Sequence, residues 1–90
     1  MEMYQLRAYV TAATLGSVTR TAEALHLTQP ALILQLKSFQ EALDLPLFTR
    51  TAQGLAPNAD GRALLPSAQR VLDALEDFER AIGALRTTVQ

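Results

Sequence analysis

The sequence contains no cysteine and a single histidine, His26, among its 90 residues. The lack of cysteine excludes a disulfide framework and a thiolate metal site, and one histidine disfavours a histidine-based metal or catalytic cluster. No stretch approaches the roughly 18 uninterrupted apolar residues of a membrane span. The N-terminal segment MEMYQLRAYV lacks the basic region and the apolar core of a secretion signal. These absences predict a cytoplasmic chain with no metal and no membrane partner.

Neither sign of charge predominates, because the formal net charge is −1. Residues 1–57 carry four basic and four acidic side chains, and residues 58–90 carry four basic and five acidic ones. This balance argues mildly against a protein that binds a polyanion. Any nucleic-acid binding must therefore depend on where the basic side chains lie. Hydrophobic residues make up 49% of the chain and charged residues 19%, which is typical of one small globular domain.

Three helices are predicted in the first half of the chain. Residues 3–15 repeat apolar side chains at helical spacing. Ser17 is a predicted N-cap for a short helix over residues 19–25, and Thr28 is a predicted N-cap for a third helix. Pro30 falls in the first turn of that third helix, where its missing N–H costs least. Two short helices joined by a turn are typical of a helix-turn-helix.

The segment DLPLFTRTAQGLAPN after the third helix predicts a hairpin. Leu47 and Phe48 on one side and Leu55 on the other flank the polar tip TAQG, whose Gly54 suits a turn. Both strands are too short for an independent sheet. We therefore expect a mainly α fold, in which three helices and a two-stranded wing form a winged helix-turn-helix over residues 1–57.

The last third of the chain has the clearest periodicity. A helix from about residue 59 to residue 87 would be ~42 Å long, and Pro66 should kink it or mark its true start. Its apolar residues recur at alternating spacings of three and four, which is the repeat of a coiled coil. A domain this small cannot cover such a seam alone, so residues 58–90 are predicted to be a linker helix that forms a homodimer. The predicted dimer interface is Leu64, Ala68, Val71, Leu75, Phe78, Ile82, Leu85 and Val89.

Several motifs together resemble the N-terminal region of a LysR-type transcriptional regulator, over nearly all of the chain. They are Ser17-Val18-Thr19-Arg20 with Ala22 and Leu25, Thr28-Gln29-Pro30-Ala31-Leu32, Pro46-Leu47-Phe48-Thr49-Arg50, and Gly61-Arg62-Ala63-Leu64-Leu65-Pro66. The resemblance implies a winged helix-turn-helix that binds double-stranded DNA, followed by a linker helix that pairs two subunits. The family's C-terminal effector-binding domain is absent from this chain. A small-molecule effector, and the tetramer that is possible in a full-length protein, are therefore expected only with that domain, and no cofactor is expected here.

The resemblance also implies which residues contact DNA. Gln29 opens the recognition helix and can bond bidentately to an adenine edge in the major groove. Arg20 and Arg50 are implied phosphate contacts, Lys37 suits a phosphate, and the capped N-termini of the second and third helices offer backbone N–H groups to phosphates. The full implied set is Ser17, Arg20, Thr28, Gln29, Pro30, Ile33, Leu34, Lys37, Arg50 and Gln53.

The chain departs from the family pattern at two of these places. Ile33 and Leu34 stand where many members have Ser-Arg, and Gln53 stands at the wing tip where many have Arg or Lys. Ile33 and Leu34 lie outside the apolar stripe of the third helix. They either face DNA, where they would touch thymine methyl groups, or are covered by the first helix or the wing. Because phosphate contacts dominate affinity, these departures bear on affinity and on the sequence that is bound.

Two classes of function remain. The first is a sequence-specific, dimeric DNA-binding module of a transcriptional regulator. The second is a winged-helix dimerisation or protein-interaction module with weak or lost DNA binding, which the near-neutral charge and the Ile33-Leu34 pair favour. An enzyme has no support, because the sequence has no nucleophile–base pair, metal cluster or phosphate-cradling glycine loop.

Overall fold

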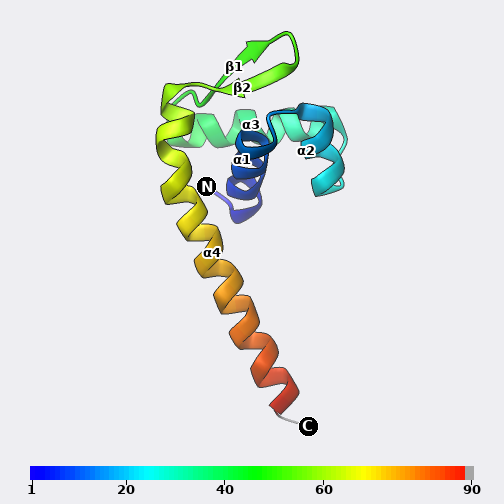
Figure 1. The fold of residues 1–90 in the computed structure, drawn as a ribbon, viewed down its shortest axis with the longest axis vertical. Coiled ribbons are helices and arrows are strands. Elements are labelled where there is room, and N and C mark those ends of the chain that lie inside the picture. The colour runs from blue at the N-terminus through cyan, green and yellow to red at the C-terminus, as the bar shows by residue number, and fades with distance from the viewer. Residues whose placement is uncertain (89–90) are drawn as a thin grey trace.

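A computed structural model describes residues 1–88 and contains four helices and one two-stranded sheet. The three short helices and the hairpin gather at one end of the long last helix, which projects away from them (Figure 1). The molecule is 52 Å long as a result. The predicted mainly α fold, a winged helix-turn-helix with a long C-terminal helix, is confirmed. Its elements are α1 (Met3–Leu15), α2 (Val18–Leu25), α3 (Gln29–Leu43), β1 (Phe48–Thr51), β2 (Gly54–Pro57) and α4 (Ala59–Thr88).

The ends of the short helices follow from local caps. The Ser17 side chain accepts a hydrogen bond from the Arg20 N–H at 3.1 Å, and the Thr28 side chain accepts one from the Ala31 N–H at 3.2 Å. Both predicted N-caps are therefore confirmed, and α2 begins at Val18 because Ser17 is its cap. Each short helix ends at a residue with a left-handed backbone, which lets the chain turn sharply. These residues are Gly16, His26 and Asp44.

The core lies where α1 crosses α3. Tyr9 is 1% exposed, and its ring stacks on Phe39 at a centroid distance of 5.5 Å and meets the edge of Phe48 at 5.9 Å. Leu32 and Leu36 are buried beside Phe39, and together they form the apolar stripe of α3. Burying these side chains fixes one side of α3 against α1 and leaves the opposite side of α3 to solvent.

The side chain of Gln40 on α3 holds the start of the hairpin. Gln40 Oε1 accepts hydrogen bonds from the N–H groups of Leu47 at 2.7 Å and Phe48 at 3.2 Å. At the far end Thr51 pairs with Gly54, which has a φ of 114°. A Cβ on Gly54 would lie 2.9 Å from Val18 Cγ2, so the turn of the hairpin approaches the start of α2.

Hydrogen bonds and one close backbone contact hold the start of α4 against the rest of the domain. Asn58 caps the helix by accepting a hydrogen bond from the Gly61 N–H at 2.8 Å, and its amide donates to the Pro46 carbonyl at 3.0 Å. A Cβ on Gly61 would lie 2.2 Å from the Leu47 carbonyl oxygen, so this close approach requires glycine. The Tyr9 hydroxyl donates to the Gly61 carbonyl, and burial raises the pKa of Tyr9 above its ordinary value of 10.0.

One residue of the predicted seam of α4 is already buried within its own domain. Ala68 is 8% exposed and packs in the core of its own domain, together with Leu72, which lies outside the predicted seam. The reason is that α4, which runs unbroken through Pro66, presents its Ala68 face to α1. Four other seam residues are exposed, two are half-buried, and Val89 lies outside the described residues. The exposed ones are Leu64, Val71, Phe78 and Leu85, and the half-buried ones are Leu75 and Ile82.

Candidate nucleic-acid interface

The outer side of α3 is open to solvent. With about 3.6 residues per turn, Pro30, Leu34 and Lys37 lie on the side opposite the buried stripe, and all three are exposed. Leu34 has 64% of its surface exposed, so nothing in residues 1–88 covers it. Ile33 is half-buried. Of the two interpretations of the Ile33-Leu34 pair, coverage by protein holds in part for Ile33 and fails for Leu34.

Gln29 lies at the edge of this side, next to α2. Its Nε2 donates a hydrogen bond to Thr19 Oγ1 at 3.1 Å, across the turn that joins α2 and α3. Both side chains remain exposed. Thr19 was not among the predicted DNA-binding residues. Its hydroxyl meets Gln29 only because of the angle between the two helices, which no local pattern encodes.

Three basic side chains border the same region. Arg20 lies in the first turn of α2, Lys37 on the outer side of α3 and Arg50 on β1, and each is exposed. Within residues 1–88 the ion pair joins Arg80 to Asp77 on α4, so none of these three cations is neutralised by a carboxylate of the chain. The elements that carry them are adjacent, since the hairpin is bonded to α3 through Gln40 and its turn reaches the start of α2.

The remaining predicted positions are also accessible. Gln53 is exposed at the tip of the hairpin, and its N–H donates to Thr51 Oγ1 at 3.2 Å. Ser17 and Thr28 each satisfy one first-turn N–H, which leaves other N–H groups of α2 and α3 for an anion. Among the described residues no group of three or more His, Cys, Asp or Glu could hold a metal ion. None of their helices is long and apolar enough to cross a membrane.

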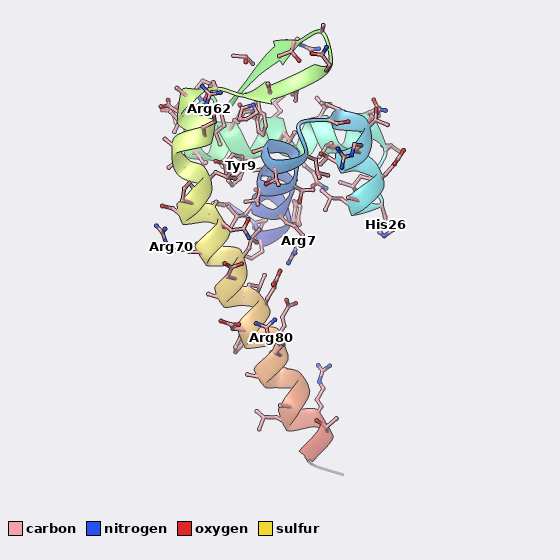
Figure 2. The ribbon with its side chains drawn as sticks, viewed as in Figure 1. Arg7, Tyr9, His26, Arg62, Arg70 and Arg80 are labelled. Carbon is pink, nitrogen blue, oxygen red and sulfur yellow. The ribbon has the colours of Figure 1, made fainter. Side chains whose placement is uncertain are left out.

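One further arginine lies close to the hairpin. Figure 2 shows Arg62 at the start of α4 beside the hairpin, whereas Arg80 lies far along α4. The Arg62 Nη1 donates to the Pro57 carbonyl at 2.7 Å, which holds the guanidinium at the base of β2. Arg62 was not among the predicted DNA-binding residues, although it lies only five residues after the end of β2.

Comparison with known proteins extends these observations. A family model described as "Bacterial regulatory helix-turn-helix protein, lysR family" matches residues 3–62. An uncharacterized HTH-type transcriptional regulator of Azotobacter vinelandii is 38% identical over 89 residues, which are 99% of this chain and 62% of that protein. The HTH-type transcriptional regulator CbbR of Xanthobacter flavus is 39% identical over 83 residues, 92% of this chain and 25% of that protein. The chain thus spans less than two thirds of the length of either relative.

Solved structures are similar along nearly the whole chain. The crystal structure of the CbnR_DBD-DNA complex has a TM-score of 0.81 at 30% identity, and the match covers 94% of this chain and 99% of the CbnR chain. Hydrogen peroxide-bound OxyR of Corynebacterium glutamicum, as a C206S mutant, has a TM-score of 0.86 at 30% identity, over 91% of this chain and 26% of its own. The BenM_DBD/catB site 1 DNA complex, at 22% identity and a TM-score of 0.85, shows the same fold.

Proposed function

This chain belongs to the lysR family of bacterial regulatory helix-turn-helix proteins, and we propose on that basis that it binds operator DNA sequence-specifically, as a homodimer, to regulate transcription. The observation that carries the proposal is the outer side of α3, where Leu34 is 64% exposed although its helix is anchored on the core. The proposed site of action is the cytoplasm. In this proposal effector binding belongs to the C-terminal domain of the family, and these 90 residues supply DNA binding and pairing.

In the proposed complex α3 lies in the major groove. The Gln29 amide bonds to an adenine edge, and the Leu34 side chain contacts the methyl group of a thymine. Arg20, Lys37 and Arg50 contact phosphates, because all three are exposed and unpaired with any carboxylate in residues 1–88. The phosphate contacts set the orientation, and the two contacts to bases select the sequence. The hairpin that carries Arg50 then follows the adjacent backbone.

Pairing is proposed to use the outward seam of α4. Phe78 and Leu85 expose 63% and 68% of their surfaces and belong to the second half of α4. That half of the helix projects from the domain (Figure 1). Exposed apolar stripes of this size are uncommon on monomers and mark sites of association. Nearer the domain, an apolar hollow of about 170 Å³ lies beside the same seam. Its lining residues are Met1, Leu6, Tyr9, Phe39, Leu43, Leu64, Ser67, Ala68 and Val71.

The shape of the monomer favours antiparallel pairing of the two α4 helices. In a parallel pair, the two domains would lie side by side and the hollow of one protomer would face the hollow of the other. No side chain of either protomer would then fill the two hollows. In an antiparallel pair, the slender projecting half of the partner helix lies along Leu64 and Val71 and covers the hollow. This arrangement buries both the proximal and the projecting parts of the seam.

Cysteine cross-linking tests the orientation, because the chain has no cysteine of its own. Leu64 and Leu85 are 21 residues apart, about 32 Å along a helix. We expect that a mixture of the Leu64→Cys and Leu85→Cys proteins gives a disulfide-linked heterodimer on oxidation, and that either variant alone does not. Cross-linking of each variant to itself, without the heterodimer, would show a parallel pair.

A salt series tests DNA binding itself. The logarithm of affinity for a site selected from a random DNA pool should fall linearly with the logarithm of salt concentration. Arg50→Ala should flatten that slope by about one unit, because one phosphate contact is lost. Arg80→Ala is the matched control, since Arg80 lies far along α4 and is paired with Asp77 (Figure 2). A protein that dimerises without salt-sensitive DNA binding is instead the protein-interaction module that its near-neutral charge favours.

A further inference from the structure

We propose that Thr19 is a positioning residue that holds the Gln29 amide for base recognition and links it to a phosphate of the DNA backbone. The inference rests on the proposed function and deepens it, because it names how the α2–α3 pair specifies one base. The observation that supports this proposal is the hydrogen bond from Gln29 Nε2 to Thr19 Oγ1 at 3.1 Å.

The backbone that carries Thr19 is held firmly. Thr19 is the second residue of α2 and lies within the first turn, which Ser17 caps. The hydroxyl of Thr21, which is fully buried, donates to the Ser17 carbonyl at 2.7 Å and fixes that turn from inside. The turn into α3 is closed by the Leu27 N–H, which donates to the Ala22 carbonyl at 2.9 Å. Thr19 is therefore a fixed point from which a flexible glutamine side chain can be oriented.

The chemistry of the amide makes this orientation useful. A glutamine amide has two N–H donors and one carbonyl acceptor. When Thr19 takes one N–H, the second N–H and Oε1 remain, and they are the donor and acceptor that an adenine edge requires. A glutamine without this bond has to lose its rotamer freedom when it binds the base. With the bond to Thr19, the glutamine side chain has already lost this rotamer freedom before DNA binds. The ordered amide then favours the correct base over the others.

The Thr19 hydroxyl has a second use. Within residues 1–88 its hydrogen has no acceptor from the chain, and the side chain is exposed at the start of α2. Hydroxyl groups and helix N-termini are common partners of phosphate oxygens. A phosphate that accepts this hydrogen completes a chain of hydrogen bonds from the DNA backbone through Thr19 and Gln29 to the base. Base recognition then depends on the correct seating of α2 on the backbone.

The experiment compares base preferences rather than overall affinity. Each position of the selected half-site is changed to all four bases, and the position at which Gln29→Ala abolishes preference is identified. Thr19→Val removes the hydroxyl and keeps the side-chain shape, and we expect it to lower preference at that position by about tenfold, the scale of one lost side-chain ordering term. Preference elsewhere should persist. Thr19→Ser keeps the hydroxyl and should restore the preference, and Thr14→Val, exposed on α1, is the matched control.

Two results would overturn the inference without touching the proposed function. One is a Thr19→Val protein that keeps the wild-type base preference, and the other is a Thr19→Ser protein that loses as much preference as Thr19→Val. Thermal unfolding of each variant separates a folding defect from a recognition defect, because the exposed Thr19 hydroxyl should hardly change the midpoint. Wild-type protein with no base preference at any position would instead overturn the proposed function, and this inference with it.

Discussion

Replacement of single thymines by deoxyuridine tests whether Leu34 contacts a thymine methyl group. The substitution removes one methyl group from the operator and leaves its hydrogen bonds intact. Each thymine of the half-site is replaced in turn, and each DNA is bound to the wild-type protein and to Leu34→Ala. At one position we expect the wild-type protein to lose affinity and the variant to lose almost none.

The expected loss of DNA affinity follows from the exposed surface of the Leu34 side chain. Full burial of a leucine is worth about 1.5–3 kcal/mol, and Leu34 exposes 64% of its surface, so covering it contributes about 1–2 kcal/mol at most. One methyl group accounts for about 0.8 kcal/mol of that contact, a loss of about fourfold per half-site. In a symmetric operator with both half-sites replaced, the loss should be about fifteenfold. Leu34→Ala should weaken binding to natural DNA by at most about 5- to 30-fold per half-site.

Fluorescence anisotropy of labelled duplexes measures the four affinities of this double-mutant cycle. The coupling energy between the methyl group and the Leu34 side chain is then read directly, because the cycle cancels unrelated effects of either change. Deoxyuridine placed in the flanking DNA is the control and should leave affinity unchanged. Equal losses for the wild-type protein and Leu34→Ala at every thymine would refute the contact, and Leu34 would then have no role in thymine recognition.

Three further changes test the pairing and the fold. Phe78→Asp places a charge on a side chain that is 63% exposed in the seam, so sedimentation should show monomers at micromolar concentration, and a persistent dimer would mean that the interface lies elsewhere. Tyr9→Phe removes the hydrogen bond to the Gly61 carbonyl and should lower the free energy of unfolding by about 1–3 kcal/mol, whereas Tyr4→Phe, at an exposed tyrosine, should not. Burial raises the Tyr9 pKa above 10.0, so the phenol ionises at lower pH in the unfolded chain than in the folded protein. The contribution of the buried phenol to stability should therefore be complete below about pH 10 and fall as pH rises through the folded pKa. Urea unfolding from pH 8 to 11 should show this decline in the wild type, and an equal decline in Tyr9→Phe would contradict the assignment to Tyr9. Gly61→Ala puts a Cβ 2.2 Å from the Leu47 carbonyl oxygen and should lower the free energy of unfolding by about 1–3 kcal/mol. Gly83→Ala, with nothing within 4 Å, is the control and should stabilise α4 by up to about 1 kcal/mol. A thermal midpoint of Gly61→Ala equal to that of the wild type would argue against the close approach.

The helix ends were predictable because their causes are local. Ser17 and Thr28 cap the helices that follow them, and each cap bond spans only three residues. Gly16 ends α1 with a φ of 64°, a conformation that glycine adopts without strain. The hairpin followed in the same way from Gly54 and its flanking apolar residues. Where information is confined to one turn of chain, the order of the residues carries it.

The faces of α4 were only partly predictable. The repeat of three and four placed Ala68 in a dimer seam, yet Ala68 and Leu72 are both buried in the core of their own domain. A helix has several faces, and a periodic pattern shows that a face is apolar without showing which neighbour covers it. In the first half of α4 two apolar faces overlap, and only the docking of Asn58 and Gly61 on the loop before β1 decides which one turns inward.

The sequence by itself determined the helices, their caps, the hairpin and the family, because these depend on neighbouring residues and on motifs at set spacings. The tertiary structure alone decided that Leu34 is exposed while Ile33 is half-buried, and that Gln29 meets Thr19 across a turn. Both depend on the angle at which α3 lies against α1 and α2. That angle is the sum of many weak packing contacts between residues distant in the chain, and no single stretch of sequence specifies it.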